Sequence, residues 1–189
     1  EMLRKVRIPK PEEIMKRYPF NLSGGMRQRV MIAMALLTNP KLIIADEPTT
    51  ALDVTIQAQV LDVMKDLQRE YGCSYIFITH DLGVISEVAD RVVVMYGGRV
   101  CECAPTDELF AHPQHPYTQG LIASRPVSGM KTDRLPVIPG NVPSLNNKPG
   151  GCPFHTRCSV AGESCSRVFP EQTEVSPEHM VACWNCGGK

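Results

Sequence analysis

The sequence lacks an excess of charge of either sign, because 20 lysines and arginines balance 20 aspartates and glutamates. The broad electropositive surface that holds nucleic acid is therefore missing, and a nucleic-acid partner is not expected. Long hydrophobic runs are also missing. The longest, Val30 to Leu37, is far shorter than the roughly 20 residues of a membrane-spanning helix. No segment is expected to cross a bilayer.

A secretory leader is not expected either, since no small-residue cleavage site follows the start at Glu1. We expect the sequence to begin inside a longer protein. Eight cysteines would suit a secreted disulfide scaffold, but three lie in or beside apolar segments and the others follow residue 150. A reducing compartment is favoured, in which Cys73, Cys101 and Cys103 act as small apolar residues.

The first 104 residues alternate strand-like and helix-like segments, which is typical of a parallel sheet covered by helices. The spacing of apolar residues predicts helices over 26–37 and from Asp53 to Gly72, a buried strand over 42–45 and an apolar strand over 75–79. Gly97 and Gly98 stand between two further strands, 92–96 and 99–103, and predict an antiparallel hairpin at the sheet edge. The fold class is therefore α/β.

The composition changes after Ala104. Prolines recur from Pro113 to Pro149 and prevent long helices or central strands, so only short helices are expected, over 107–110 and 117–123. We therefore predict two domains, 1–104 and 105–189, the second being a small irregular extension rich in cysteine.

Two adjacent carboxylates follow the first apolar strand. Asp46 and Glu47 come directly after residues 42–45, so they lie at the C-terminal edge of the sheet, where open α/β sheets bind ligands. There Asp46 would hold Mg²⁺ through a water, and Glu47 would activate a water for phosphoryl transfer. The alternative is that this Asp-Glu-Pro step only ends a strand and caps the next element.

A polar group also follows the next strand. His80 lies within Thr79-His80-Asp81, where it would donate to a phosphate or position a water. The alternative is a histidine with ordinary partners at a strand end. The presence of Asp46 and Glu47 on the neighbouring strand favours the functional interpretation.

The segment Leu22-Ser-Gly-Gly-Met-Arg-Gln28 places a hydroxyl group and two glycines at the start of a helix. Ser23 can cap that helix, and free backbone N–H groups with the helix dipole favour an anion there. A phosphate could therefore dock at Ser23, Gly24 and Gly25. The alternative is an ordinary helix N-terminus with a flexible approach.

The order of these motifs carries more information than any one of them. Residues 22–28, then Asp46-Glu47, then Ala51-Leu52-Asp53, then His80 resemble the signature, Walker B, D-loop and switch histidine of ATP-binding cassette (ABC) ATPases. The resemblance covers roughly residues 15–104. It implies the C-terminal part of a P-loop ABC-type ATPase domain, with ATP and Mg²⁺ as cofactors.

The same resemblance implies roles for individual residues. Asp46 would assist Mg²⁺, Glu47 would be the general base, and His80 would contact the γ-phosphate. Two cassettes would face head to tail, so that Ser23, Gly24 and Gly25 touch the nucleotide of a second ATPase subunit, identical or different. Asp53 would communicate across this dimer, and Gln28 and Arg27 would support the nucleotide.

One family motif is missing, because no G-x-x-x-x-G-K-[ST] occurs in the sequence. This Walker A loop cradles the β- and γ-phosphates with its amides and lysine. The chain alone is therefore expected to be inactive. A fragment explains the absence, since the family places this loop well upstream of the signature.

The extension resembles a known C-terminal region. Phe110 to Thr118 and Pro139 to Pro143 are similar to the extension of ABC importer ATPases for dipeptides, oligopeptides or nickel. This implies import, transmembrane permease subunits as partners, and an extracytoplasmic solute-binding protein as an indirect one. The ATPase would lie peripherally on the cytoplasmic face of the cell membrane.

Four cysteines of the extension, Cys152, Cys158, Cys165 and Cys183, have a spacing that fits poorly to zinc sites, which usually open with a C-x2-4-C knuckle. Thiolates from an irregular segment suit an iron–sulfur cluster, and some relatives with this extension carry [4Fe–4S]. Unligated thiols or two disulfides are the alternatives. Cys186 competes with Cys183 as fourth ligand, and His155 and His179 are spare ligands.

Two other functions remain open at this point. A truncated half-cassette with a metal-bearing or cluster-bearing tail would act as a regulatory binding module, which the missing Walker A loop favours. A cassette ATPase of DNA repair or translation is opposed by the balanced charge and by the importer-like extension.

Overall fold

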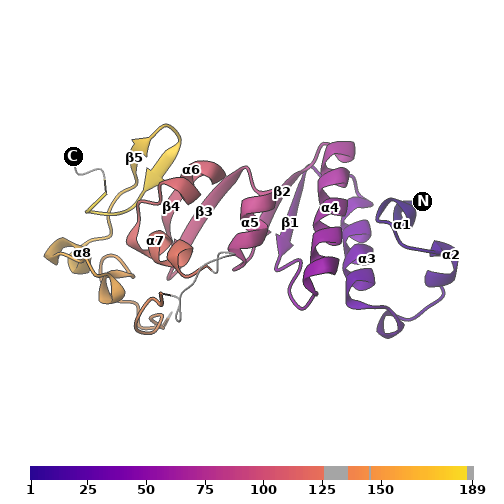
Figure 1. Cartoon of the computed structure of the whole chain (residues 1–189), viewed down its shortest axis with the longest axis horizontal. Coiled ribbons are helices and arrows are strands. Elements are labelled where there is room, and N and C mark those ends of the chain that lie inside the picture. The colour runs from indigo at the N-terminus through magenta and orange to yellow at the C-terminus, as the bar shows by residue number, and fades with distance from the viewer. Residues whose placement is uncertain (126–135, 145, 187–189) are drawn as a thin grey trace. The chain divides into compact units, whose positions relative to one another are not determined.

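The computed structural model describes residues 1–125, 136–144 and 146–186. The chain forms two compact units, Glu1–Val84 and Ile85–Lys189 (Figure 1). The change in composition near residue 105 lies between β4 and α6, inside the second unit. No described helix is both long and apolar enough to span a bilayer.

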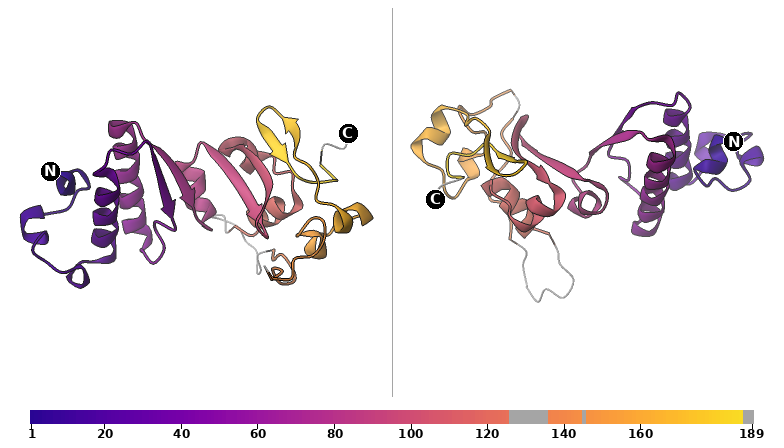
Figure 2. Two further views of the ribbon diagram at one scale, coloured as in Figure 1. Left: turned by 180° about the vertical axis from the view of Figure 1, so that it is seen from behind. Right: turned by 90° about the horizontal axis from the view of Figure 1, so that it is seen from above.

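Unit 1 combines helices with a parallel pair of strands. Its elements are α1 (Met2–Lys5), α2 (Pro11–Ile14), the 3-10 turn η1 (Pro19–Asn21), α3 (Gly24–Leu36), β1 (Leu42–Asp46), α4 (Val54–Tyr71) and β2 (Ser74–Ile78). The helix α5 (Leu82–Val88) runs across the division between the units. Helices α3 and α4 pack side by side, and α1 packs against α3 (Figure 2).

Helix α4 begins and ends as its sequence predicts. The Oδ1 of Asp53 accepts the N–H of Ile56 at 2.9 Å, which satisfies a free donor of the first turn. Gly72 ends the helix with φ at 62°, a left-handed conformation that costs glycine little. Apolar side chains at helical spacing face the core: Val60, Leu61, Val63, Met64 and Leu67.

Helix α3 also confirms its predicted cap. The Oγ of Ser23 accepts the N–H of Met26 at 3.3 Å, and the helix begins at Gly24, two residues before the predicted start. Leu36 is fully buried near the other end, and burial of such a side chain stabilises the fold by roughly 1.5–3 kcal/mol.

The two strands of unit 1 pair in parallel, from Leu42 opposite Ser74 to Asp46 opposite Ile78. One face, with Ile43, Ala45, Tyr75 and Phe77, packs against the core of the unit. On the other face Leu42, Ile44, Ile76 and Ile78 are exposed. The prediction of a buried strand over 42–45 is therefore wrong for alternate residues, because within the described part of the chain only one face is covered.

Unit 2 is built on an antiparallel sheet. Its elements are β3 (Arg91–Tyr96), β4 (Arg99–Pro105), α6 (Thr106–Ala111), α7 (Pro116–Ala123), η2 (His155–Arg157), α8 (Glu163–Arg167), β5 (Thr173–Ser176) and β6 (His179–Val181). The strand order is β3-β4-β6-β5. Helix α6 packs against β3 and β4 (Figure 1).

The predicted hairpin is present, but it belongs to a different sheet. Gly97 and Gly98 turn the chain with φ at 55° and 77°, and β3 pairs with β4. The hairpin does not join β1 and β2 in the described part of the chain; β4 pairs instead with β6, from near the C-terminus. The hairpin thus lies at an edge, with β3 as the outer strand, but its sheet is completed by β6 and β5, which are short strands that periodicity did not predict.

A fully buried carboxyl group joins three segments of unit 2. One oxygen of Glu102 on β4, Oε1, accepts the N–H of Gln114 at 2.7 Å and lies 2.7 Å from Nε2 of His179 on β6. Its other oxygen accepts the N–H of His115 at 2.9 Å. Both Glu102 and His179 have no exposed surface. The strand β6 and the approach to α7 thus depend on one side chain.

We expect His179→Ala to lower the free energy of unfolding of unit 2 by about 3–5 kcal/mol, because it leaves a buried carboxyl group without its side-chain partner. Urea denaturation followed by the fluorescence of Trp184, the single tryptophan, measures this. Glu171→Ala, at an exposed position, is the control. An unchanged midpoint for His179→Ala would contradict the role of Glu102 as a junction.

Candidate functional site

The C-terminal ends of β1 and β2 meet at one edge of the parallel pair. Asp46 is the last residue of β1 and is exposed. Glu47 donates its backbone N–H to the carbonyl of Ile78, the last residue of β2, at 2.8 Å. His80 follows two residues after Ile78. Strand pairing thus brings Glu47 and His80 together, as the sequence pattern predicts for neighbouring strand ends.

The carboxylate of Glu47 is held at both oxygens. Its Oε1 lies 2.8 Å from Nδ1 of His80, and its Oε2 accepts the hydroxyl of Thr50 at 2.5 Å. The Thr50 and His80 contacts lower the pKa of Glu47, and the Glu47 carboxylate raises the pKa of His80. Glu47 is therefore ionised near neutral pH, as a general base must be.

The contact with Thr50 did not emerge from the sequence. The residues from 47 to 53 form a tight loop, in which the N–H of Thr50 donates to the carbonyl of Glu47 at 3.2 Å. Glu47 and Ala51 both have positive φ, 47° and 66°. The available signal was a threonine three residues after a carboxylate in a short loop, a spacing at which side chains meet across a turn.

Asp81 and Asp53 have structural partners at the same end of unit 1. The Oδ1 of Asp81 accepts the N–H of Gly83 at 2.8 Å, and its Oδ2 accepts Nε2 of Gln57 on α4 at 3.3 Å. Asp53 caps α4 through Ile56. A cap role for Asp53 therefore exists whether or not it also communicates with a second subunit.

The glycines at the start of α3 lie close to the 47–53 loop and to α4. A Cβ on Gly25 would stand 2.4 Å from Cγ2 of Ile56, and one on Gly24 would stand 3.2 Å from Cδ2 of Leu52. Gly25 is buried, whereas Ser23 and Gly24 are exposed. Close packing against α4 thus requires glycine at 25, and the exposed helix start leaves Ser23 and Gly24 accessible.

Within the described residues, no hydrogen bond links Ser23 to Glu47 or His80 at the ends of β1 and β2. Arg27 is exposed and Gln28 half-buried on α3. The resemblance to ABC ATPases implies this separation, because the signature would serve the nucleotide of the other subunit.

Four cysteines of unit 2 line a common cavity, and they are the four that the sequence singled out: Cys152, Cys158, Cys165 and Cys183. The N–H of Cys152 donates to the carbonyl of Cys165 at 2.8 Å. Phe154, Pro170 and Trp184 give the cavity an apolar lining. His155 also lies in this lining, whereas His179 is bound to Glu102.

Burial raises the pKa of the Cys152 and Cys158 thiols, so both are protonated near neutral pH. The cavity between the thiols measures about 10 Å³, the space of a single water. Among the described residues, no three histidine, cysteine, aspartate or glutamate side chains are arranged to hold a metal ion. The donors suit a cluster chemically, but the cavity is too small to hold one, so the side chains around it would have to rearrange.

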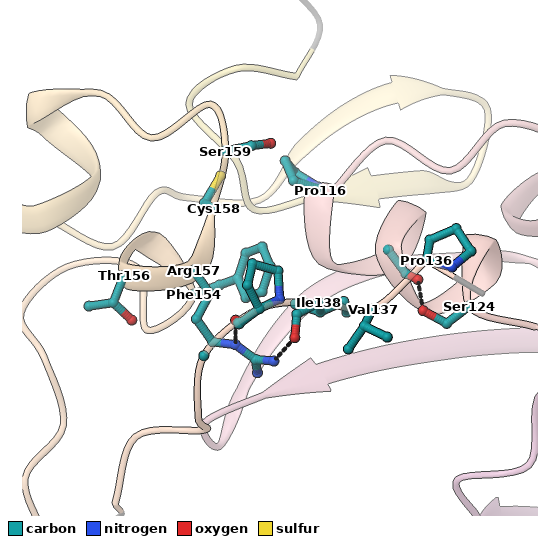
Figure 3. A pocket seen from close by; sticks show the side chains of 13 residues that line it. Pro116, Ser124, Pro136, Val137, Ile138, Phe154, Thr156, Arg157, Cys158 and Ser159 are labelled. Carbon is teal, nitrogen blue, oxygen red and sulfur yellow. Dashed lines mark hydrogen bonds between the residues drawn. The ribbon is translucent and has the colours of Figure 1, made fainter. Parts of the chain in front are cut away.

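Unit 2 has a second, larger concavity, of about 440 Å³, beside α7 and η2 (Figure 3). Arg157 lies in the wall of this concavity, and each of its three guanidinium nitrogens donates a hydrogen bond. Its guanidinium donates to the carbonyls of Pro139 and Ile138 at 2.7 and 2.9 Å, and to the hydroxyl of Tyr96 at 3.1 Å. Arg157 therefore fixes the backbone at 138–139, and no general base faces this concavity among its described lining residues.

Comparisons with known proteins agree with both halves of the sequence. The family model described as "ABC transporter" matches residues 1–50, and the model described as "Oligopeptide/dipeptide transporter, C-terminal region" matches residues 101–165. The oligopeptide transport ATP-binding protein AppD of Bacillus subtilis is 59% identical over 97% of this chain and 56% of its own length. The chain is therefore similar, over almost its whole length, to an ATP-binding protein of an oligopeptide transporter.

Other relatives of this ABC family give the same picture. The dipeptide transport ATP-binding protein DppD of Bacillus subtilis is 52% identical over 97% of the chain and 55% of its own length. A probable peptide ABC transporter ATP-binding protein, y4tR of Sinorhizobium fredii, is 54% identical with the same coverage of each chain. The chain spans about half the length of the curated relatives it matches.

Solved structures of ABC proteins share the fold. CbiO1 of Clostridium perfringens, part of the ABC transporter complex cbiONQ, aligns with a TM-score of 0.52 at 35% identity, over 59% of this chain and 43% of its own. The ATP-binding cassette MJ1267 in its ADP conformation aligns with a TM-score of 0.54 at 23% identity, over 62% and 46%. The predicted α/β fold of an ABC ATPase domain is confirmed.

We expect the pKa of the His80 imidazole to lie above its ordinary value, because the Glu47 carboxylate stabilises the charged ring, and to fall in Glu47→Gln. The ion pair needs an ionised Glu47 and a protonated His80, so it exists only at pH values between the lowered pKa of Glu47 and the raised pKa of His80. It is lost when the pH falls below the pKa of Glu47 or rises above the pKa of His80. Histidine NMR signals followed against pH measure this. Asp46→Asn, which removes a neighbouring charge but not the contact, is the control; equal effects of both variants would argue against the pairing.

Proposed function

We propose that the chain is the C-terminal part of an ATPase subunit that powers import of dipeptides or oligopeptides by an ABC transporter. The observation that carries this proposal is the contact between Glu47 and His80 at the carboxyl edge of a parallel strand pair. The names of the relatives support peptides as the transported class. Selection among peptides would then lie in other subunits.

Residues 1–104 would form part of the nucleotide-binding domain, and residues 105–189 the importer-type extension. The uncovered face of β1 and β2 supports the first assignment. Parallel strands are normally covered on both faces, yet here four apolar side chains are exposed on one of them: Leu42, Ile44, Ile76 and Ile78. The rest of a complete cassette, with its Walker A loop, would cover this face.

Each polar group of the strand edge has a chemical task in this proposal. MgATP, when bound, supplies the phosphoryl group that is transferred to water. Asp46 would orient a water of the Mg²⁺ shell, and Glu47 would accept a proton from the attacking water. His80 lies 2.8 Å from Oε1 of Glu47 and would donate to a terminal phosphate. Positioning and electrostatics would therefore provide most of the catalysis.

The helix start at Ser23 and Gly24 would contribute to the nucleotide site of a second ATPase subunit, identical or different. Its exposure supports this, as does its separation from Glu47. Asp53 would lie at the same dimer contact, with Gln28 close to the nucleotide. Permease subunits would be the direct membrane partners and a solute-binding protein an indirect one, with the ATPase on the cytoplasmic face of the membrane.

We expect Glu47→Gln in the full-length protein to lower the kcat of ATP hydrolysis by about 10²–10⁴-fold while ATP binding is retained, because the general base is lost. A phosphate-release assay with a separate ATP-binding measurement tests this. Asp62→Asn, an exposed change on α4, is the control. A full-length protein that joins the permease but neither binds nor hydrolyses ATP would favour the regulatory module.

We also propose that Cys152, Cys158, Cys165 and Cys183 hold a [4Fe–4S] cluster. Their convergence on one apolar cavity supports this, since a cluster needs one cysteine at each iron and few other contacts. Such a cluster holds its cysteines farther apart than a single ion does. Among the described residues Cys186 is absent from the cavity lining, which favours Cys183 as the fourth ligand.

For the cluster we expect about four iron and four acid-labile sulfide per chain in anaerobically purified protein. Cys183→Ser should lose most of both, and Cys186→Ser, the matched control, should retain them. Stoichiometric zinc without sulfide would replace the cluster with a structural zinc site. Absence of all metal would leave four unligated thiols.

A further inference from the structure

Thr50 differs from the other partners of Glu47 in where it lies. His80 reaches Glu47 from the end of β2, and its side chain is 80% exposed. Thr50 reaches the same carboxylate from within the 47–53 loop, through a hydroxyl contact of 2.5 Å and a backbone bond of 3.2 Å to the Glu47 carbonyl. The two contacts close a small ring of hydrogen bonds around Glu47.

The backbone gives this ring a function. Glu47 and Ala51 have left-handed φ angles, which non-glycine residues adopt only when their surroundings hold them. The N–H of Glu47 is tied to Ile78 on the neighbouring strand. The main chain of Glu47 is thus fixed, and its side chain is still free to rotate unless a partner holds it. The Thr50 hydroxyl is exposed, as the His80 imidazole is, but a backbone hydrogen bond ties Thr50 to Glu47, so the hydroxyl stays within reach of Oε2.

We propose that Thr50 is the positioning residue of the catalytic carboxylate: its hydroxyl holds Oε2 of Glu47 and so directs Oε1 toward His80 and the attacking water. This inference rests on the proposed ATPase function of Glu47. His80 and Thr50 each occupy one site on a different oxygen, so each oxygen keeps a lone pair that can accept from the attacking water. The two contacts together fix the orientation of the carboxylate.

The neighbouring threonine provides a matched comparison. Thr49 is 5% exposed, and within the described part of the chain no hydrogen bond joins its hydroxyl to Glu47. Thr49 and Thr50 have the same side chain at adjacent positions of one loop. Only Thr50 contacts the carboxylate, so replacement of each by valine separates positioning from general effects on the loop.

The charged groups around the carboxylate come from two strand ends. Asp46 precedes Glu47, His80 lies against Oε1, and Asp81 follows His80. From α4, Gln57 is neutral and is bound to Asp81. None of these donates to Oε2, so within the described residues no other side chain replaces Thr50 when its hydroxyl is removed.

The test is ATP hydrolysis by the full-length protein with Thr50→Val, Thr50→Ser, Thr49→Val and Glu47→Gln. We expect Thr50→Val to lower kcat about tenfold or more with the KM for ATP nearly unchanged, as loss of one hydrogen bond to a charged group predicts. Thr50→Ser should restore kcat to within about threefold of wild type, because serine keeps the hydroxyl, and Thr49→Val should remain near wild type.

Two results separate the inference from the function on which it rests. If Glu47→Gln abolishes hydrolysis while Thr50→Val keeps the wild-type kcat, the positioning role is wrong and the general base stands. If Glu47→Gln hydrolyses ATP normally, the proposed function fails first. A Thr50→Val protein with raised KM and no rescue by serine would show a structural role for the loop, and circular dichroism of each variant identifies misfolding.

Discussion

The parallel pairing of β1 and β2 is the constraint on which the candidate site depends. The ladder runs in register from Leu42 and Ser74 to Asp46 and Ile78, and the N–H of Glu47 extends it by one bond. A shift of register by one residue would turn every side chain to the opposite face. Glu47 would then lose His80, and the core face of the sheet would lose its contacts with α3 and α4.

The elements that sequence could predict are those whose signals are local. Asp53 and Gly72 mark the ends of α4 because a cap and a left-handed residue act within one turn. Gly97 and Gly98 mark the hairpin in the same way. The candidate edge residues were also predictable, since a polar group directly after an apolar strand must lie at the end of that strand.

Contacts between distant residues could not be predicted in this way. Glu102 and His179 are 77 positions apart, and nothing in the alternation of β4 indicates that one of its buried residues carries a carboxyl group. The short strand β6 exists because it pairs with β4, so its three residues gave no periodic signal. The Thr50 contact was missed for a different reason: it is local, but it depends on positive φ angles that sequence does not show.

The buried junction and the cysteine cavity belong to one arrangement in unit 2. Glu102 fixes the N–H of His115, which lines the cavity, and it also fixes His179, four residues before Cys183. Thiols far apart in the sequence converge only if both segments are held. A cluster bound there would add its own bonds to this arrangement. Without one, the Glu102 contacts hold the cavity walls together with bonds such as those from Cys152 to the carbonyl of Cys165 and from Trp184 to the carbonyl of Val168.

The exposure of Glu47 and His80 explains how such a site would respond to closure. With His80 80% and Glu47 39% exposed, water screens their attraction in the isolated chain. Any surface that covers this edge would remove that water and strengthen each contact, because electrostatic interactions grow as the local dielectric falls. Thr50 is also exposed, so its contact with Oε2 would strengthen on closure together with that of His80. The hydrogen bonds at the two oxygens would then fix the carboxylate in the state in which closure of the dimer makes it catalytically effective.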